Sequence, residues 1–192
     1  VYAWGLNSSG QLGTGNTTNY YTPVRVANYN RSGYLNNIVD ISAGAAHGLF
    51  LKADGTVYSI GYNGYGQLGI NNRSNQYYPV QVKDDTAAKF LSNITDIGGG
   101  AHHSVALSAD GYVYTWGRNH VGQLGVGSTT DRNYPIKVRT TANSGAIDNA
   151  TAIGGRQYSN MAILTNGTTV GWGYNPDGML GDGSASKRTY PF

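Results

Sequence analysis

Apolar residues alternate with polar ones over short stretches of this chain. Val39 and Ile41 fall on one face of an extended segment at residues 39–42. Leu49 and Leu51 do the same at residues 47–52. Alternation with a period of two over four to six residues predicts half-buried β-strands. The pattern therefore places a first and a second strand at these two segments.

A turn dipeptide follows the second predicted strand. Asp54-Gly55 tolerates positive φ at both central positions of a type I′ turn, so it predicts a hairpin to a third strand at residues 57–60. After a glycine-rich loop, alternation at Val24 and Val26 predicts a fourth strand, with Pro23 tolerated at its start.

The whole pattern repeats every 56 residues without a gap. The segments WGLNSSGQLG, IGYNGYGQLG, WGRNHVGQLG and WGYNPDGMLG begin at Trp4, Ile60, Trp116 and Trp172. The turn glycine recurs as Gly55, Gly111 and Gly167. The chain is thus one repeat array, 1–192, with units 1–56, 57–112 and 113–168 and a partial unit 169–192. Four antiparallel strands per unit make a β-propeller blade, so we predict an all-β fold of about 3.4 blades.

The repeated residues resemble the repeat of the regulator of chromosome condensation family. The resemblance rests on the run GGGAHHSVALSADG at 98–111, which continues as YVYTWGRNHVGQLGVG, and on the proline that follows it. It covers essentially the whole chain and implies a propeller of about seven blades closed into a ring. Three positions depart from the family pattern: Ile60 replaces Trp, Met179 replaces Gln, and Ser159 stands where the blade histidine is His47 or His103.

A partial propeller cannot close on itself. An open arc leaves unpaired edge strands and half-covered sheet faces at both ends. We expect the sequence to be an excerpt of a longer chain, or else self-association to supply the remaining blades.

Residues in register on the strands are expected to be structural. His47 and His103 alternate with apolar residues and point inward, as hydrogen-bonded core histidines do. Trp4, Trp116 and Trp172 are expected to pack between blades, and Gly55, Gly111 and Gly167 to make turns. The glycine run 98–100 opens no helix, so close packing explains it better than phosphate binding.

Composition argues against most kinds of chemistry. The 192 residues include no Cys and no Glu, and only 12% are charged, with a net charge of +3. No motif assembles a nucleophile, a metal site or a cofactor site, so we predict a protein without enzymatic activity, metal or cofactor. The interspersed charges disfavour nucleic-acid binding, and no apolar run is long enough for membrane insertion as a helix.

The loops offer the best candidates for a binding surface. In an up-and-down blade, the loop between strands one and two lies on the same face as the loop between strands three and four. We therefore expect a shared rim, and its candidate partner-binding residues are Tyr62, Tyr65, His102, Arg118, His120, Tyr158 and Tyr174. Tyr, Asn, Ser and Gly suit recognition loops, because Tyr gives a large contact area at modest entropic cost.

These observations favour a protein-binding or structural scaffold module, either self-associating in a surface appendage or binding a protein partner. The weakly charged composition favours an extracellular or cell-surface location, with the cytoplasm as the alternative. The family resemblance implies two other functions: an inhibitor that covers a partner with a propeller face, or a guanine-nucleotide exchange factor. N-linked glycans are a further hypothesis, from seven sequons at Asn7, Asn16, Asn30, Asn72, Asn93, Asn149 and Asn166.

Overall fold

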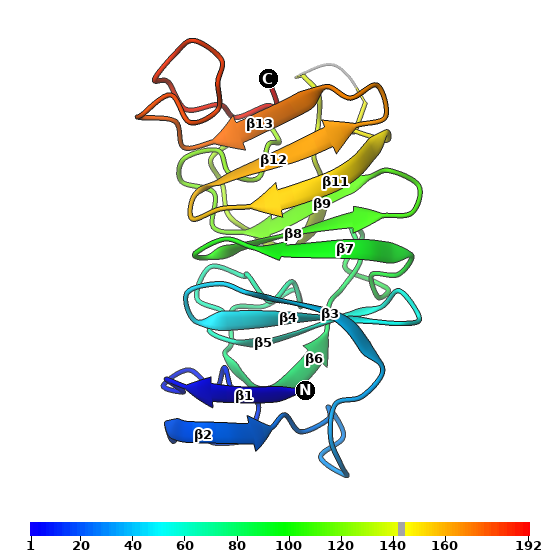
Figure 1. The fold of residues 1–192 in the computed structure, drawn as a ribbon, viewed down its shortest axis with the longest axis vertical. Helices are drawn as coiled ribbons and strands as arrows, with labels where there is room; N and C mark the ends of the chain where they lie inside the picture. The colour runs from blue at the N-terminus through cyan, green and yellow to red at the C-terminus, as the bar shows by residue number, and fades with distance from the viewer. Residues whose placement is uncertain (142–144) are drawn as a thin grey trace.

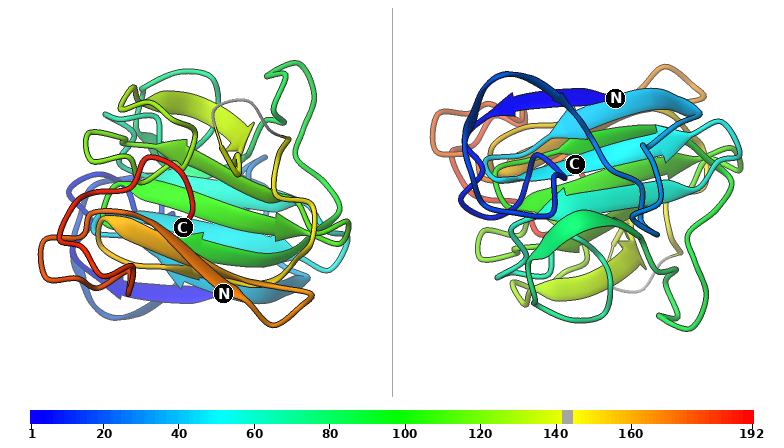
Figure 2. Two further views of the ribbon diagram at one scale, coloured as in Figure 1. Left: turned by 90° about the horizontal axis from the view of Figure 1, so that it is seen from above. Right: turned by 90° about the horizontal axis from the view of Figure 1, so that it is seen from below.

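The fold is a stack of four antiparallel β-sheets. The computed structural model describes residues 1–141 and 145–192. Figure 1 shows the sheets following one another in chain order along the long axis, and in Figure 2 they overlie one another along that axis. We call them blades 1 to 4. The architecture confirms the predicted all-β, partial propeller.

Blade 1 contains β1 (Tyr2–Gly5) and β2 (Tyr20–Arg25). Blade 2 contains β3 (Ile38–Ala43), β4 (His47–Lys52), β5 (Val57–Gly61) and β6 (Gln76–Gln81). Blade 3 contains β7 (Ile94–Gly99), β8 (His103–Ser108), β9 (Val113–Gly117) and β10 (Arg132–Lys137). Blade 4 contains β11 (Ala150–Gly155), β12 (Ser159–Leu164) and β13 (Thr169–Gly173). A 56-residue unit counted from residue 1 therefore begins with the third strand of one blade and ends within the next blade.

The first three strands of each blade lie where alternation predicts them, but the fourth does not. β6 begins three residues before Pro79, whereas the sequence analysis placed the proline at the start of the strand. The pairing between β5 and β6 jumps from Ser59↔Val80 to Gly61↔Gln76, so Pro79 lies in a bulge. Because a bulged residue has no ladder partner, the missing N–H of proline costs no hydrogen bond there.

The predicted turn type is also wrong. Gly55 has a φ of 77°, but Asp54 is not among the residues with positive φ, so the turn cannot be type I′. The N–H of Gly55 donates to the carbonyl of Lys52, and the N–H of Lys52 donates to the carbonyl of Thr56. This is a three-residue loop, a type I turn closed by a left-handed glycine. Gly111 and Gly167, with φ of 79° and 82°, fill the same position.

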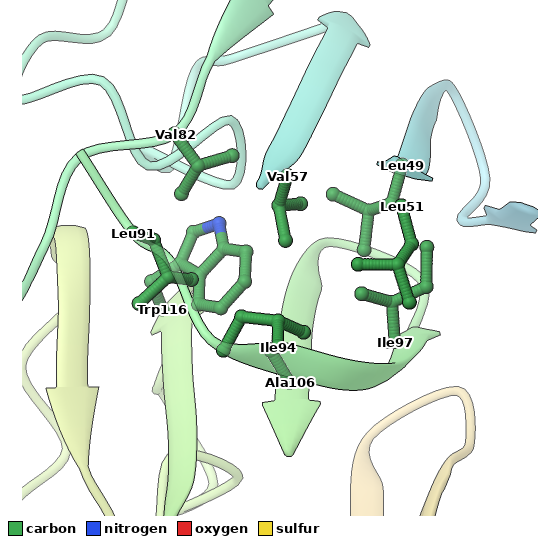
Figure 3. Close-up of a cluster of buried hydrophobic side chains, with 9 residues drawn as sticks. All are labelled: Leu49, Leu51, Val57, Val82, Leu91, Ile94, Ile97, Ala106 and Trp116. Atoms are coloured by element: carbon green, nitrogen blue, oxygen red, sulfur yellow. The ribbon is translucent and has the colours of Figure 1, made fainter. Parts of the chain in front are cut away.

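The hydrophobic cores lie between blades and not within them. The cluster in Figure 3 joins residues from blade 2, from the segment that follows it and from blade 3. It consists of Leu49, Leu51, Val57, Val82, Leu91, Ile94, Ile97, Ala106 and Trp116. A second cluster joins blades 3 and 4 in the same way, and a third lies between blades 1 and 2. Each sheet therefore buries a face only against its neighbour, and we call each such interface a seam.

Backbones approach closely at the inner edge of the seams. β3 contacts β7, and β7 contacts β11. A Cβ atom on Gly99 would lie 2.8 Å from the carbonyl carbon of Ala43, and one on Gly98 would lie 3.2 Å from the nitrogen of Gly155. Only glycine leaves room for backbones at that distance, so close packing accounts for this glycine run.

A chain of hydrogen bonds crosses the seam between blades 2 and 3. Nε2 of His47 lies 3.1 Å from Oγ of Ser104, and that hydroxyl donates to the carbonyl of Gln67 at 2.9 Å. The indole N–H of Trp116 donates to the same carbonyl at 2.8 Å. Because the Ser104 hydroxyl donates its proton to Gln67, its oxygen can only accept from His47. His47 therefore carries a proton on Nε2 and donates it to Ser104. The predicted structural histidine is thus buried and hydrogen-bonded to the next blade.

The next seam repeats the arrangement with one substitution. Asn160 takes the place of Ser104 and accepts from Nε2 of His103 at 3.0 Å. Its amide donates to the carbonyl of Gln123 at 2.7 Å, as does the indole N–H of Trp172 at 3.0 Å.

The seam between blades 1 and 2 has no such polar chain. Gly48 and Ile60 stand where the later seams have Ser104 and Trp116, so blade 2 offers neither donor. A Cβ atom on Gly13 would lie 2.9 Å from Cδ1 of Ile60, so the isoleucine packs over the loop glycine much as the tryptophan does elsewhere. The replacement of Trp by Ile thus converts a polar seam into an apolar one.

Trp4 departs from the expected packing role. Its side chain is 61% exposed, whereas Trp116 and Trp172 are fully buried. Trp116 and Trp172 are each buried against the preceding blade, and the described residues place no such blade against Trp4.

Burial makes the two seam histidines sensitive to acid. It lowers the pKa of His47 to about 3 and that of His103 to about 4 from an ordinary value of 6.5. Between pH 6.5 and pH 4 the unfolded chain therefore binds protons that the folded chain does not. We expect the free energy of unfolding to fall through this window by about 1.4 kcal/mol per pH unit for each histidine. Urea unfolding at a series of pH values measures the slope.

The variant His103→Gln should reduce that slope, whatever its effect on stability at pH 7. His120→Gln is the comparison variant: His120 is exposed and lies outside the seams, so its removal should change the slope less than His103→Gln does. Equal slopes for the wild type and His103→Gln would contradict the assignment of His103 as a neutral, buried donor.

Candidate functional site

The predicted rim loops do share one face. β7, β11 and β13 all end at the left of Figure 1, so the loops that follow them lie on that side. The short loops 100–102 and 156–158 lie beside the long loops 62–75, 118–131 and 174–187. Backbone bonds join them, since the N–H of Tyr62 donates to the carbonyl of Ala46 and that of Arg118 donates to the carbonyl of His102.

A buried asparagine holds each long loop together. The amide nitrogen of Asn63 donates to the carbonyls of Asn72 and Ser74 at 3.0 and 3.1 Å, while its Oδ1 accepts from the N–H of Leu68 at 2.9 Å. Asn7, Asn119 and Asn175 make the corresponding bonds, and all four are fully buried. The sequence analysis assigned these residues no structural role, although their recurrence every 56 residues was a visible signal.

The role of Asn7 bears on the glycan hypothesis. Its amide nitrogen, the glycan attachment atom of that sequon, donates inside the loop and is buried. The folded chain therefore leaves no room for a glycan at Asn7. The other six sequon asparagines are exposed, and glycosylation there stays a prediction: Asn16, Asn30, Asn72, Asn93, Asn149 and Asn166.

The structure brings the first four rim candidates into one cluster. The ring of His102 lies 6.0 Å from that of Tyr62 and 5.2 Å from that of Tyr65, measured between centroids. The guanidinium of Arg118 lies 4.6 Å from the Tyr65 centroid, a cation–π contact between the loops of blades 2 and 3.

The other three candidates continue the row toward blade 4. His120 lies 5.6 Å from Tyr158, edge to face, and Tyr158 lies 6.1 Å from Tyr174. We call the seven residues the rim cluster: Tyr62, Tyr65, His102, Arg118, His120, Tyr158 and Tyr174. Five are half-buried, and His120 and Tyr174 are exposed. Partner binding by the cluster stays a prediction, but its members do form one surface.

Positive charge shapes the rim cluster. Burial lowers the pKa of His102, and the Arg118 guanidinium lowers it further. Burial also lowers the pKa of His120, with Arg118 and Lys187 adding to the effect and Asp131 opposing it. Both imidazoles are therefore neutral at pH 7, and Arg118 makes no salt bridge with the described residues.

The geometry offers little for catalysis. His47 and Ser104 resemble a base and nucleophile pair, but both are buried and the serine proton is already donated to Gln67. Among residues 1–141 and 145–192, no group of three or more metal-ligating side chains comes together. In the same ranges, no helix has the length and apolar character needed to cross a membrane.

Models of known families match this chain in successive stretches that follow its repeat. The model of the regulator of chromosome condensation (RCC1) repeat matches residues 1–51, 54–107 and 110–158. The chain belongs to the RCC1 repeat family. A second RCC1 repeat model matches residues 38–67 and 94–123, which begin at the first strands of blades 2 and 3.

Similar proteins are considerably longer than this RCC1 repeat chain. It is 31% identical over 191 residues to the ultraviolet-B receptor UVR8 of Arabidopsis thaliana, and 33% identical over 192 residues to the probable E3 ubiquitin-protein ligase HERC4 of Homo sapiens. Both alignments cover all of this chain, but only 41% of UVR8 and 17% of HERC4.

Solved structures show the same fold. Prp20p from Saccharomyces cerevisiae superposes with a TM-score of 0.75 at 22% identity, covering 99% of this chain and 45% of Prp20p. Human WBSCR16 superposes with a TM-score of 0.60 at 21% identity, covering 100% of this chain and 61% of that one. The chain therefore forms part of a β-propeller of the RCC1 type.

The charges near the rim histidines lead to a prediction that distinguishes the effect of Arg118 on their pKa values from that of Lys187. Removing the charge of Arg118 with Arg118→Ala should raise the pKa of both His102 and His120. Lys187→Ala should raise the pKa of His120 alone, because Lys187 does not contribute to the shift of His102. NMR titration of the imidazole resonances measures both values. An unchanged His102 pKa in Arg118→Ala would contradict the cluster geometry.

The loop asparagines lead to a second prediction. Asn119→Ala removes two donated bonds and one accepted bond from a fully buried site, so we expect a loss of about 2–4 kcal/mol in the free energy of unfolding. Limited proteolysis should then cut first within 118–131. Asn36→Ala is the matched control, because Asn36 is exposed, and its stability should change by less than about 0.5 kcal/mol.

Proposed function

We propose that this chain is a non-enzymatic protein-binding module whose contact surface is the rim cluster. The observation that carries the proposal is two groups of aromatic contacts on one face, Tyr62, Tyr65 and His102 with Arg118 over Tyr65, and His120, Tyr158 and Tyr174. The charge of Arg118 acts on the histidine of each group. Tyrosine and arginine dominate the energetics of protein interfaces, because their large side chains give contact area and directed hydrogen bonds together.

The rigidity of the rim supports the same function. Asn63 and Asn119 fix the backbones of the two long loops, so little conformational entropy remains to be lost on binding.

Relatives support a protein partner. One solved structure contains yeast RCC1 (Prp20) bound to Kap60, and another study of Prp20p describes its binding to Gsp1p and histones. From this comparison we propose for the present chain only that its partner is a protein. An extracellular or cell-surface location remains a proposal that rests on composition alone.

A double variant tests the rim directly. Tyr62→Ala with Arg118→Ala removes one ring and the stacked guanidinium without touching a seam. The immobilised wild-type chain and this variant should be compared by quantitative mass spectrometry of the proteins that each captures from an extract of the source organism. We expect at least one protein to be captured at least about tenfold less by the variant.

The matched control is Tyr21→Ala with Arg139→Ala, which also removes one tyrosine and one arginine, but from outside the rim loops. The control should capture the same proteins as the wild type. Equal capture by all three chains would contradict the rim as the contact surface.

A further inference from the structure

A second recessed surface lies at the outer edge of blade 2, away from the rim cluster. It has a volume of about 580 Å³. β6 forms its floor, and its sides come from the segments before β3 and after β6 and from the loop between β5 and β6. Its aromatic walls are Tyr29, Tyr58, Tyr78 and Phe90. We call this surface the outer groove, and its size is within the range of ligand pockets.

One cation stands in the outer groove without an acidic partner. Arg31 is the single charged residue among those that line it, and its guanidinium lies 4.6 Å from the ring centroid of Tyr78. None of the four salt bridges formed by the described residues involves Arg31. A guanidinium in a cation–π contact can still donate its N–H groups to a carboxylate.

The rings beside Arg31 form an apolar platform. Tyr29 and Tyr58 lie 6.0 Å apart, tilted by 33°. Tyr58 is buried, whereas Tyr29 is 62% exposed and Phe90 is 49% exposed. Lys83 lies 4.4 Å from the Phe90 centroid and adds a second cation at the border of the groove. Such a platform suits an aromatic side chain with a negative charge nearby, and it disfavours a cationic ligand.

The next blade provides an internal comparison. At the positions 56 residues after Tyr29, Arg31 and Phe90, the chain has Asp85, Ala87 and Ala146. Ala87 has a φ of 59° and Arg31 a φ of 63°, so the backbone is alike while the side chains differ.

Blade 3 has no cation at the Arg31 position, and its nearby cation, Lys137 at the position of Gln81, is already paired with a carboxylate. Lys137 lies 3.7 Å from the Asp85 carboxylate and 4.0 Å from the Tyr112 centroid. Blades 2 and 3 therefore share one backbone framework, and among the described residues compared, blade 2 has the extra rings and the guanidinium without a salt bridge.

We propose that the outer groove binds an acidic peptide segment in which an aromatic side chain neighbours a carboxylate. The carboxylate pairs with Arg31, and the aromatic side chain packs on Tyr29 and Phe90. Gln76 and Gln81 also line the groove and contribute side-chain amides to it. This site shares no residue with the seven-residue rim cluster, although Ile70 and Asn72 of the loop 62–75 line it.

Random copolymers of glutamate and tyrosine provide a defined probe. Binding of a fluorescent poly(Glu,Tyr) to the chain is measured by anisotropy, with poly(Glu) and poly(Lys,Tyr) measured in parallel. We expect saturable binding of poly(Glu,Tyr), binding of poly(Glu) at least about tenfold weaker, and no binding of poly(Lys,Tyr).

Two variants locate the binding. Arg31→Gln keeps the length and hydrogen-bonding capacity of the side chain but removes the charge, and Tyr29→Ser removes an exposed ring. Each should weaken poly(Glu,Tyr) binding at least about tenfold. Lys137→Gln, the charge-removing control in blade 3, should leave the affinity within about twofold.

Three results would overturn the proposal. Absence of saturable poly(Glu,Tyr) binding would remove the site, and equal binding of poly(Glu) would remove the aromatic requirement. Equal losses of poly(Glu,Tyr) affinity in Arg31→Gln and Lys137→Gln would show that the polymer binds through general electrostatic attraction and not in the outer groove. Because rim variants are not used, failure here leaves the proposed function of the rim cluster untouched.

Discussion

Every blade of this chain depends on a neighbour to cover the face of its sheet. The apolar side chains that alternation directs to one face, such as Leu49 and Leu51, are buried by Ile97 and Trp116 of the next blade. A four-stranded sheet of five- and six-residue strands has no second layer of its own, so face-to-face contact is the source of its core. The exposed Trp4 shows the same constraint where no neighbour is present.

The seam also determines the shape of the rim. Gln67 accepts bonds from Ser104 and Trp116 through its backbone carbonyl, while its side-chain Oε1 accepts from the backbone N–H of Tyr65. One residue thus links blade packing to the position of a rim tyrosine. Gln123 does the same one repeat later, bonding the N–H of Val121 and lying 3.4 Å from Nδ1 of His120. A rim built on the seams is as rigid as the seams themselves, which favours its use as a preformed binding surface.

Much of this architecture could be predicted from the sequence because the same pattern recurs in each repeat. Period-two alternation located the first three strands, and the common face of the loops followed from blade topology. The fourth strand was misplaced because a bulge absorbs Pro79, and propensity rules do not anticipate bulges. The turn at Gly55 was mistyped because Asp-Gly serves both two- and three-residue loops.

Contacts between blades were the part that sequence could not supply. The alternation placed His47 inward, but its bond to Ser104 joins residues 57 apart and depends on how two sheets stack. The outer groove likewise combines segments on both sides of blade 2. The central claim, that polar contacts across a seam couple neighbouring blades, is tested most directly by a double-mutant cycle on His103→Ala and Asn160→Ala. Urea unfolding at pH 7 should give a coupling energy of at least about 1 kcal/mol, and additive losses within about 0.3 kcal/mol would contradict the account.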